Sequence, residues 1–255
     1  MKFFLPAIVS VCLVALTSSV SAQWSTTFGG SYAHISADGL TANDWNANAS
    51  IGVSLSDLGL NFQGNAGYAN VSADSTSQND LDGGLAAFWR NDKFRMGASG
   101  AYSAYNVGNS ETKHLINYGG FGEWFPGIFT LGAKVGGFTG SDGAGGLYLG
   151  GETAAYPLPN LVLSATVDYA DFNASGSFHD IDVSPQVEWL VSEEIPVSVY
   201  AGYTYVAISN LPSGNIFFVG LRLYTNGNGA TTLMDRQRSG TVGWGTSFSP
   251  LDASL

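Results

Sequence analysis

Two aspartates, Asp168 and Asp182, have a spacing that suggests a chemical function. If the chain folds back around Ser175, their carboxylates lie opposite each other on neighbouring strands. Two facing carboxylates repel each other unless a cation lies between them or one of them is protonated. Carboxylates that surround a passage favour cations, so this pair suggests a site that attracts positively charged solutes. The alternative is that both side chains lie in water and select nothing.

A lysine has a comparable relationship to a glutamate. In a hairpin that turns within residues 139–145, Lys134 lies opposite Gly150 and diagonal to Glu152. Diagonal neighbours on paired strands are within reach of long side chains, so Lys134 and Glu152 could form an ion pair.

The arginines form a group of their own. By the same reasoning Tyr200 lies opposite Arg222. Three arginines fall near one end of their strands: Arg90, Arg95 and Arg222. Each of them could pair with Glu123 or Glu188. The inward-facing candidates for a constriction are therefore Lys134, Glu152, Asp168, Asp182, Glu188, Tyr200 and Arg222.

Metal binding and catalysis receive little support. The chain has three histidines, His34, His114 and His179. They fall on separate segments, whereas a zinc site needs clustered ligands, and the best local group is His179 with Asp180 and Asp182. No histidine lies near a recognisable serine motif, and residues 143–146 lack the Lys-Ser/Thr of a phosphate loop. We expect no metal, no cofactor and no enzymatic activity, and a membrane hydrolase is the least favoured alternative.

The composition limits which elements can position these side chains. Of 255 residues, 45% are hydrophobic and only 11% are charged, which is too little charge for an ordinary soluble domain. The mean hydropathy of +0.10 is too low for a bundle of membrane helices. The 34 glycines also argue against a helical protein, because glycine costs about 1 kcal/mol at a helical position. A β protein whose apolar surface need not face water fits this composition.

The first 22 residues have the pattern of a secretory signal peptide. Lys2 precedes the apolar run of residues 3–16, and Val20, Ser21 and Ala22 form a small-residue cleavage site. The only cysteine, Cys12, lies in this segment, so the mature chain is expected to be free of cysteine. Removal of residues 1–22 leaves 8 basic and 20 acidic residues, a net charge of −12, which argues against nucleic acid as a partner.

Apolar and polar residues alternate with a period of two along the mature chain. In residues 46–56, Ile51 and Val53 share one face, whereas Asn48 and Ser50 share the other. Strict alternation predicts a strand with one apolar and one polar face. About twelve such segments follow one another, with 10 to 14 as the range, and most are near the ~10 residues that a tilted strand needs to cross a bilayer.

Two features distinguish a membrane barrel from a soluble sandwich. Short links are predicted to alternate with long polar links, as periplasmic turns alternate with outer loops. The long links are predicted at residues 36–44, 70–80, 108–113, 139–145, 171–178 and 209–214. Aromatic residues also fall at the strand ends, as in the girdles of a membrane barrel. At one rim these are Trp24, Trp89, Trp124 and Trp189, and at the other they are Tyr32, Tyr68, Tyr169 and Tyr205.

This pattern resembles the small porin-like β-barrel proteins of the Gram-negative outer membrane. The resemblance implies an all-β, antiparallel up-and-down transmembrane barrel over residues 23–225, placed there by the barrel-assembly machinery in contact with outer-membrane lipid. It also implies a homo-oligomer as one arrangement. Such barrels usually end on an aromatic residue, whereas this chain ends at Leu255; Phe248 and Tyr224 are candidates for that signal. Residues 226–255 are therefore a tail, a plug or a further strand.

Inward positions are mostly small and polar, which suits a hydrated lumen better than a packed one. We expect a channel for passive diffusion of small hydrophilic solutes with a mild preference for cations. The alternative is a closed structural or surface-interaction barrel whose lumen is filled by its own side chains or by residues 226–255.

Overall fold

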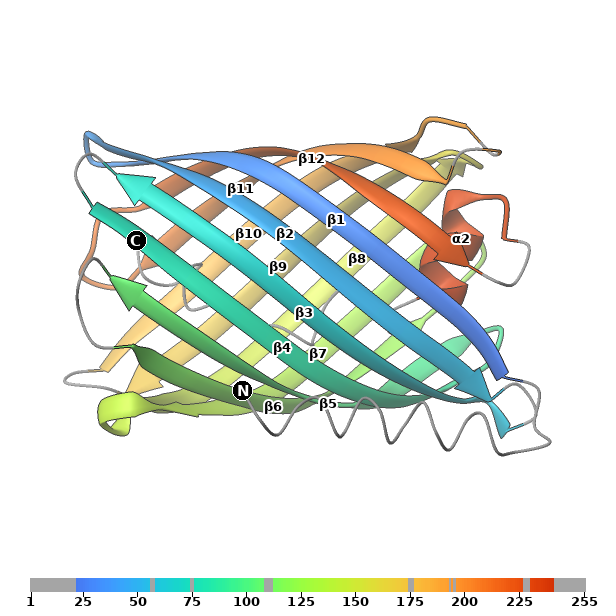
Figure 1. Ribbon diagram of the computed structural model, residues 1–255, viewed down its shortest axis with the longest axis horizontal. Helices are drawn as coiled ribbons and strands as arrows, with labels where there is room; N and C mark the ends of the chain where they lie inside the picture. Colours follow the sequence, from blue (N-terminus) through green and yellow to red (C-terminus); the bar gives the residue numbers. More distant parts are fainter. Residues whose placement is uncertain are drawn as a thin grey trace.

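The computed structural model is a closed β-barrel of twelve antiparallel strands, with one short helix at one end (Figure 1). The structure describes residues 22–55, 58–73, 76–107, 112–173, 177–192, 194, 196–226 and 230–240. The expected signal peptide falls almost entirely outside the described residues, since β1 begins at Ala22. No helix in the described part of the chain is long and apolar enough to span a membrane.

The strands follow one another around the barrel in sequence order, and β1 closes the ring by pairing with β12. The predicted all-β, up-and-down barrel of about twelve strands is therefore confirmed. The strands are β1 (Ala22–Ala37), β2 (Leu40–Leu55), β3 (Leu60–Ala73), β4 (Thr76–Arg90), β5 (Phe94–Val107), β6 (Lys113–Trp124), β7 (Phe129–Gly140), β8 (Gly145–Leu158), β9 (Leu161–Asn173), β10 (Ser177–Leu190), β11 (Val197–Ile208) and β12 (Gly214–Asn226). A single 3-10 turn, η2 (Ser141–Gly143), joins β7 to β8, and α2 (Leu233–Ser239) follows β12.

The register of the pairs sets the tilt of the strands. Starting at Ala37 and stepping from partner to partner once around the ring, one returns to β1 at Gln23, 14 residues lower on the same strand. A stagger of this size in a twelve-stranded barrel corresponds to a tilt of about 40° and a backbone radius of about 11 Å. A backbone ring of this radius has room for a helix or for a file of hydrated solutes. The inward side chains determine how much of that space remains.

We call the end of the barrel with the β2–β3 turn and α2 the inner end, and the end with the Asp38–Gly39 turn the outer end. Three of the predicted long outer links are wrong, those at residues 36–44, 70–80 and 171–178, where the strands run on and only two or three residues join them. The other three, at residues 108–113, 139–145 and 209–214, agree with the observed connections to within two residues at each end. Asp38 and Gly39 alone join β1 to β2, both with positive φ, and no other outer connection exceeds five residues. The strands continue through the polar residues because a strand that has left the lipid can be polar on both faces, so polarity alone does not end it.

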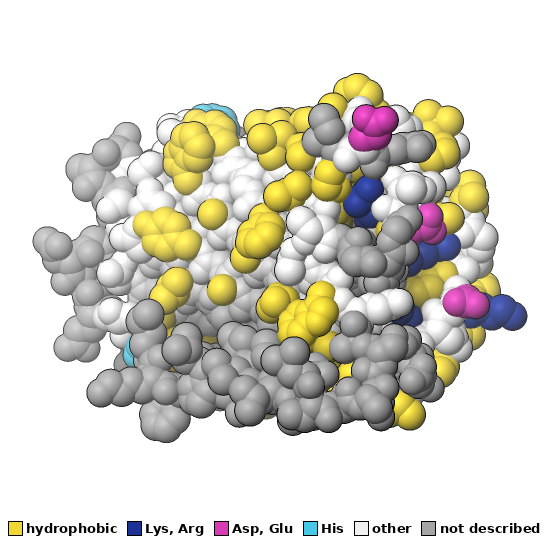
Figure 2. Space-filling model, turned by 45° about the vertical axis from the view of Figure 1, so that its right-hand side comes forward, with side chains coloured by type: hydrophobic (Ala, Val, Ile, Leu, Met, Phe, Trp, Pro, Cys, Tyr) yellow, Lys and Arg dark blue, Asp and Glu magenta, His cyan; other side chains and the backbone are white. Residues whose placement is uncertain are grey.

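The outer wall of the barrel is apolar between two aromatic rims, and Figure 2 shows hydrophobic side chains scattered over it with Lys and Arg gathered near the inner end. The four predicted rim tryptophans and four rim tyrosines all lie on this outward face. Trp189 pairs with Leu161 and Tyr169 with Ile181, so eight residues separate the two rims. At about 3.3 Å per residue and a 40° tilt, the band between them is about 20 Å tall.

The outer rim has a repeated construction that the sequence did not suggest. In five of the six outer hairpins, an outward tyrosine hydroxyl is hydrogen-bonded to an asparagine or histidine side chain on the next strand. The pairs are Tyr32–Asn43, Tyr68–Asn79, Tyr102–His114, Tyr169–His179 and Tyr203–Asn215. Each ring stays against the apolar band while its hydroxyl reaches a polar group above it, as expected at a lipid–water boundary.

Candidate functional site

Six aspartates point into the outer half of the lumen. Asp168, Asp180 and Asp182 lie on β9 and β10, and Asp44, Asp80 and Asp82 lie on β2 and β4. All six lie within seven residues of the outer ends of strands that are 13 to 16 residues long. In a ring of twelve strands, β4 and β10 are six apart and stand on opposite sides. The lumen therefore carries two facing acidic arcs, one on β2–β4 and one on β9–β10.

Sequence reasoning found only the β9–β10 arc. The register places Asp168 directly opposite Asp182, as expected. Asp44 and Asp80 were assigned to long links that do not exist, and Asp82 adjoined one of them. Continuing the period-two pattern of β4 back from Ala86 would have placed Asp80 and Asp82 on the inward face.

The arc on β9–β10 binds the only lysine or arginine in the middle of the described lumen, and this residue belongs to another strand. Lys134 on β7 lies opposite Gly150 on β8, and Gly150 lies opposite Asp168 on β9. Because Gly150 has no side chain, Lys134 and Asp168 meet over it, with Nζ 2.8 Å from Oδ1. A Cβ at Gly150 would clash with both groups. Glu152, the partner expected for Lys134, is the next inward residue on β8, toward the inner end.

The inner end of the lumen holds a buried network around Glu188 on β10. Glu188 is fully buried, and its carboxylate accepts hydrogen bonds from Ser198 (2.5 Å), Tyr224 (2.7 Å) and Arg222 (2.5 Å). The sequence predicted that Tyr200 lies opposite Arg222, and this prediction is wrong. Arg222 pairs with Ser198 and Tyr200 with Gly220, because the β11–β12 hairpin is centred one residue earlier than predicted, which shifts the pairing by two residues. The Arg222 guanidinium nevertheless covers the Tyr200 ring, 4.8 Å from its centroid.

A second buried ion pair lies across the inner end. Arg95 on β5 donates to both oxygens of Glu123 on β6, with Nε to Oε2 at 3.0 Å and Nη2 to Oε1 at 2.7 Å. The two side chains are almost completely buried. The Arg95 guanidinium also lies 5.7 Å and 5.9 Å from the centroids of Phe88 and Phe125. Such bidentate, stacked arrangements hold a guanidinium in one orientation.

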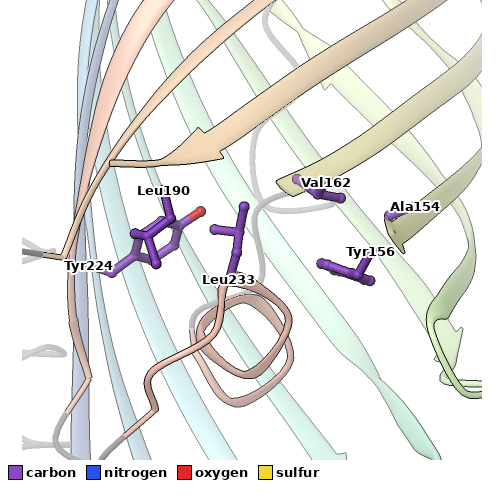
Figure 3. Close-up of a cluster of buried hydrophobic side chains, with 6 residues drawn as sticks. All are labelled: Ala154, Tyr156, Val162, Leu190, Tyr224 and Leu233. Carbon is purple, nitrogen blue, oxygen red and sulfur yellow. The ribbon is translucent and has the colours of Figure 1, made fainter. Parts of the chain in front are cut away.

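The helix α2 lies inside the inner mouth (Figure 1). Its first residue, Leu233, is fully buried among inward side chains of β8, β9, β10 and β12. In the close-up of Figure 3, Leu233 lies between Leu190 and Tyr224 on one side and Val162, Ala154 and Tyr156 on the other. The described part of residues 226–255 is therefore a plug. A further strand is not needed, since β12 already closes the ring; residues 241–255, with Phe248, lie outside the described residues.

Polar contacts fix the rest of α2. Gln237 donates to Glu188 (3.1 Å) and accepts from the Tyr156 hydroxyl (2.8 Å). Arg90 donates to the main-chain oxygen of Ser239 at the C-terminal end of the helix (2.6 Å). Arg238 donates to the Phe129 carbonyl (2.5 Å) and lies 5.1 Å and 5.3 Å from the ring centroids of Phe125 and Tyr156. The helix is thus bound to β4, β7, β8, β10 and β12.

A small cavity lies between the C-terminal end of α2 and one side of the wall. It has a volume of about 10 Å³ and is lined by Ser239 and Gly240 and by inward and rim residues of β1 to β4. A cavity needs about 10–15 Å³ to hold one water, so α2 packs closely against this side of the inner mouth. In the described residues, α2 therefore narrows the inner mouth.

The histidines lie outside the lumen, at the outer rim. The His179 ring is 3.0 Å from the Tyr169 hydroxyl and 3.4 Å from the Asp171 carboxylate through Nδ1. The Ser209 hydroxyl accepts from the backbone N–H of His179, so the serine near this ring bonds the main chain. Within the described residues, no three His, Cys, Asp or Glu side chains are arranged to hold a metal ion.

Comparisons with known proteins identify the fold. No protein-family model and no curated protein sequence matches the chain. Solved structures do: the β domain of the Bordetella autotransporter BrkA (TM-score 0.51, 12% identity, covering 80% of this chain and 99% of that one), and the KdgM porin in complex with disordered oligogalacturonate (0.50, 12%, 76% and 98%). The translocator domain of the autotransporter NalP from Neisseria meningitidis has a TM-score of 0.49, with 11% identity and coverage of 86% and 93%. The chain therefore has the fold of outer-membrane β-barrels.

Proposed function

We propose that this protein is a channel in the outer membrane of a Gram-negative bacterium, through which small hydrophilic solutes diffuse with a preference for cations. The observation that carries the proposal is the pair of facing acidic arcs. Six aspartates line the outer half of the lumen, and in the described residues the inward lysines near them are Lys134, which pairs with Asp168, and Lys113 at the outer end of β6.

Simple electrostatics supports a cation preference. A carboxylate 8 Å from a monovalent ion in water changes its energy by about 0.5 kcal/mol, which is a factor of about two in local concentration. In a lumen with a backbone radius of about 11 Å, every permeating ion passes within a Debye length of the acidic arcs at physiological salt. Several carboxylates acting together therefore enrich cations and exclude anions.

The remaining lumen wall supports passage of polar solutes. Inward side chains of β1, β2 and β3 are short and polar, among them Ser31, Asn46 and Ser50, and Asn61 and Gln63 continue this surface toward the inner end. Such groups can hydrogen-bond to water and to solutes without binding any one solute tightly. A general diffusion channel needs weak contacts of this kind, because a tight site would retain the solute.

A closed structural barrel is the second candidate, and one observation favours it: α2 occupies the inner mouth and packs against inward side chains of four strands. On this hypothesis the protein supports the membrane or binds a surface partner, and the acidic arcs have no permeating ion to act on.

The location is supported by the apolar band of about 20 Å between two aromatic rims, which is close to the ~25 Å expected of outer-membrane barrels. A cleaved signal peptide over residues 1–22, insertion by the barrel-assembly machinery, and association into homo-oligomers belong to this proposal. So does the absence of enzymatic activity.

Ion conductance across planar bilayers tests the proposal. Purified, refolded protein is expected to give discrete current steps and a reversal potential that favours K⁺ over Cl⁻ in a KCl gradient. The variant Asp168→Asn with Asp182→Asn is expected to lower the K⁺/Cl⁻ permeability ratio. Asp171→Asn, on the outer face of the same strand, is the matched control and is expected to leave the ratio unchanged. Absence of steps in the full chain and in every variant that lacks α2 would reject the channel.

A further inference from the structure

We propose that α2 is a gate that unbinds from the inner mouth to open the pore, and that it does not belong to the permanent wall. The inference rests on the proposed channel function and specifies how that channel is regulated. The observations that carry it are a wall that is complete without α2, a helix that depends on the wall, and the charges that the helix brings into the pore.

The wall keeps its two buried ion pairs when α2 is removed, while Arg90 loses its hydrogen bond to Ser239. Glu188 retains Arg222, Tyr224 and Ser198 after it loses Gln237. Arg95 and Glu123 pair with each other. Since unpaired buried charges are what make a structural element indispensable, the barrel can stay closed as a sheet while α2 is absent.

The helix, in contrast, depends on the wall. It has seven residues, and isolated helices shorter than about 12–15 residues are marginal in water. Within the helix, the N-cap Thr232 accepts a hydrogen bond from the Asp235 N–H. The C-terminal end is stabilised from outside, by Arg90 of β4. Unbinding therefore also favours loss of the helix, and the open state gains the chain entropy that binding removed.

The apolar part of the attachment to the wall is narrow. Leu233 is the one fully buried apolar side chain of the helix, held by Val162, Leu190 and Tyr224. Between the end of β12 at Asn226 and Leu233 lie six residues, enough to span about 20 Å when extended. The helix can therefore leave the mouth while β12 remains paired with β1 and β11.

Binding of α2 also changes the charge of the pore. The helix brings Arg236 and Arg238, together with Asp235, into the inner mouth of a lumen whose acidic arcs attract cations, which is a net charge of +1. This positive charge opposes the ions that the arcs enrich, so the closed state blocks cations both by volume and by charge. Unbinding removes the obstruction and this net charge together.

A cysteine lock tests the gate in the full chain. Leu233→Cys with Leu190→Cys joins α2 to β10 inside one buried cluster, and Leu233→Cys with Val162→Cys joins it to β9 as an independent second pair. The chain has a single native cysteine, Cys12, so a Cys12→Ser background leaves no competing thiol. Gel mobility with and without reductant reports the disulfide, and the two single-cysteine variants of each pair are the controls.

The expected result is a silent bilayer with oxidised protein and current steps after a reductant is added, with single-cysteine variants unaffected by oxidation. In the unlocked full chain, Leu233→Ala is expected to raise the open probability tenfold or more. Leu58→Ala, exposed in an inner turn, is expected to leave it unchanged.

Two results would overturn the gate and leave the channel standing. Oxidised, fully locked protein that conducts like reduced protein means that solutes pass without movement of α2. Silence in both redox states, together with steady conductance from a chain ending at Asn226 or from full-length Leu233→Asp, means that α2 is a fixed plug. Silence of all these folded variants would instead reject the proposed channel itself.

Discussion

Lys134 on β7 and Asp168 on β9 form an ion pair across an intervening strand, with Nζ 2.8 Å from Oδ1, because Gly150 on β8 leaves the space between them open. A glycine at this inward position therefore determines which charges in the lumen are neutralised. Asp182, which lies opposite Asp168, shares the positive charge that Lys134 brings to this side.

The variant Gly150→Ala is expected to separate the pair, because its methyl group would occupy the place of the Asp168 carboxylate and the Lys134 side chain. Overpacking of this kind costs about 1–3 kcal/mol. Urea unfolding of the barrel in lipid vesicles, followed by tryptophan fluorescence, measures the loss. The adjacent Gly151→Ala faces outward, where the nearest atom is 3.9 Å from the new Cβ, and should be close to neutral. Equal losses in both variants would contradict the assigned geometry.

Lys134→Gln is expected to strengthen the cation preference. This variant removes the positive charge that lies beside Asp168. Cations are therefore enriched further, by about twofold at a distance of 8 Å from the changed charge. The reversal potential in a KCl gradient should shift in the direction of K⁺, and the shift should shrink as the salt concentration rises. Lys93→Gln, exposed in an inner turn, serves as the control, and an effect of equal size there would argue for a general charge effect.

The arc on β2–β4 gives a separate prediction. Asp80→Asn with Asp82→Asn is expected to lower the K⁺/Cl⁻ permeability ratio about as much as Asp168→Asn with Asp182→Asn does, roughly fourfold if each carboxylate contributes a factor of two. Single-channel reversal potentials decide it. An unchanged ratio for the Asp80/Asp82 variant, beside a lowered ratio for the Asp168/Asp182 variant, would restrict selectivity to one wall of the lumen.

Removal of Glu188 should destabilise the barrel strongly. Glu188→Ala leaves the partly exposed Arg222 and the Tyr224 and Ser198 hydroxyls without their carboxylate partner. Breaking a fully buried pair costs about 3–5 kcal/mol, and we expect a loss toward the lower end of that range. The free energy of unfolding in urea is the measurement. Glu194→Ala, which is exposed in the following inner turn, should change it by less than about 0.5 kcal/mol.

The apolar band predicts where arginine is not tolerated. Leu221 on β12 is outward-facing and lies between the two aromatic rims. Leu221→Arg is expected to cost about 2–4 kcal/mol, as an arginine does at the middle of a bilayer. Leu211→Arg, equally exposed but in an outer turn, should be nearly neutral. Unfolding in vesicles compares the two, and equal costs would mean that the band does not face lipid.

The fold could be predicted because period two is a local property. Residues 46–56 alternate strictly, and β2 and its neighbours follow that pattern in the structure. The ends of the strands could not be predicted in the same way. Above the outer rim both faces of a strand meet water, so the alternation of apolar and polar residues stops there. The strand itself continues through polar residues such as Asp44 and Asp80.

The candidate site was predicted in part for the same reason. Asp168 and Asp182 were placed opposite each other because the predicted hairpin was centred on Ser175, which is also the centre of the observed pairing. Arg222 was placed opposite Tyr200, two residues out of register, since a turn that starts one residue later shifts the pairing by two. The helix α2 has too few residues for a helical period to stand out, and its position depends on contacts with six separate strands.

The short outer turns have a consequence for how the barrel reaches its place. One end of a membrane barrel has to be carried through the hydrocarbon layer during assembly, and the cost rises with the polar chain and charge that it drags along. Outer connections of two to five residues limit the polar chain that has to cross beyond the strands, and because Lys113 is the only Lys or Arg described at that end, the charge carried across is mainly that of the aspartates. The inner end, with Arg90, Lys93, Arg95 and the arginines of α2, would stay on the side from which the protein came.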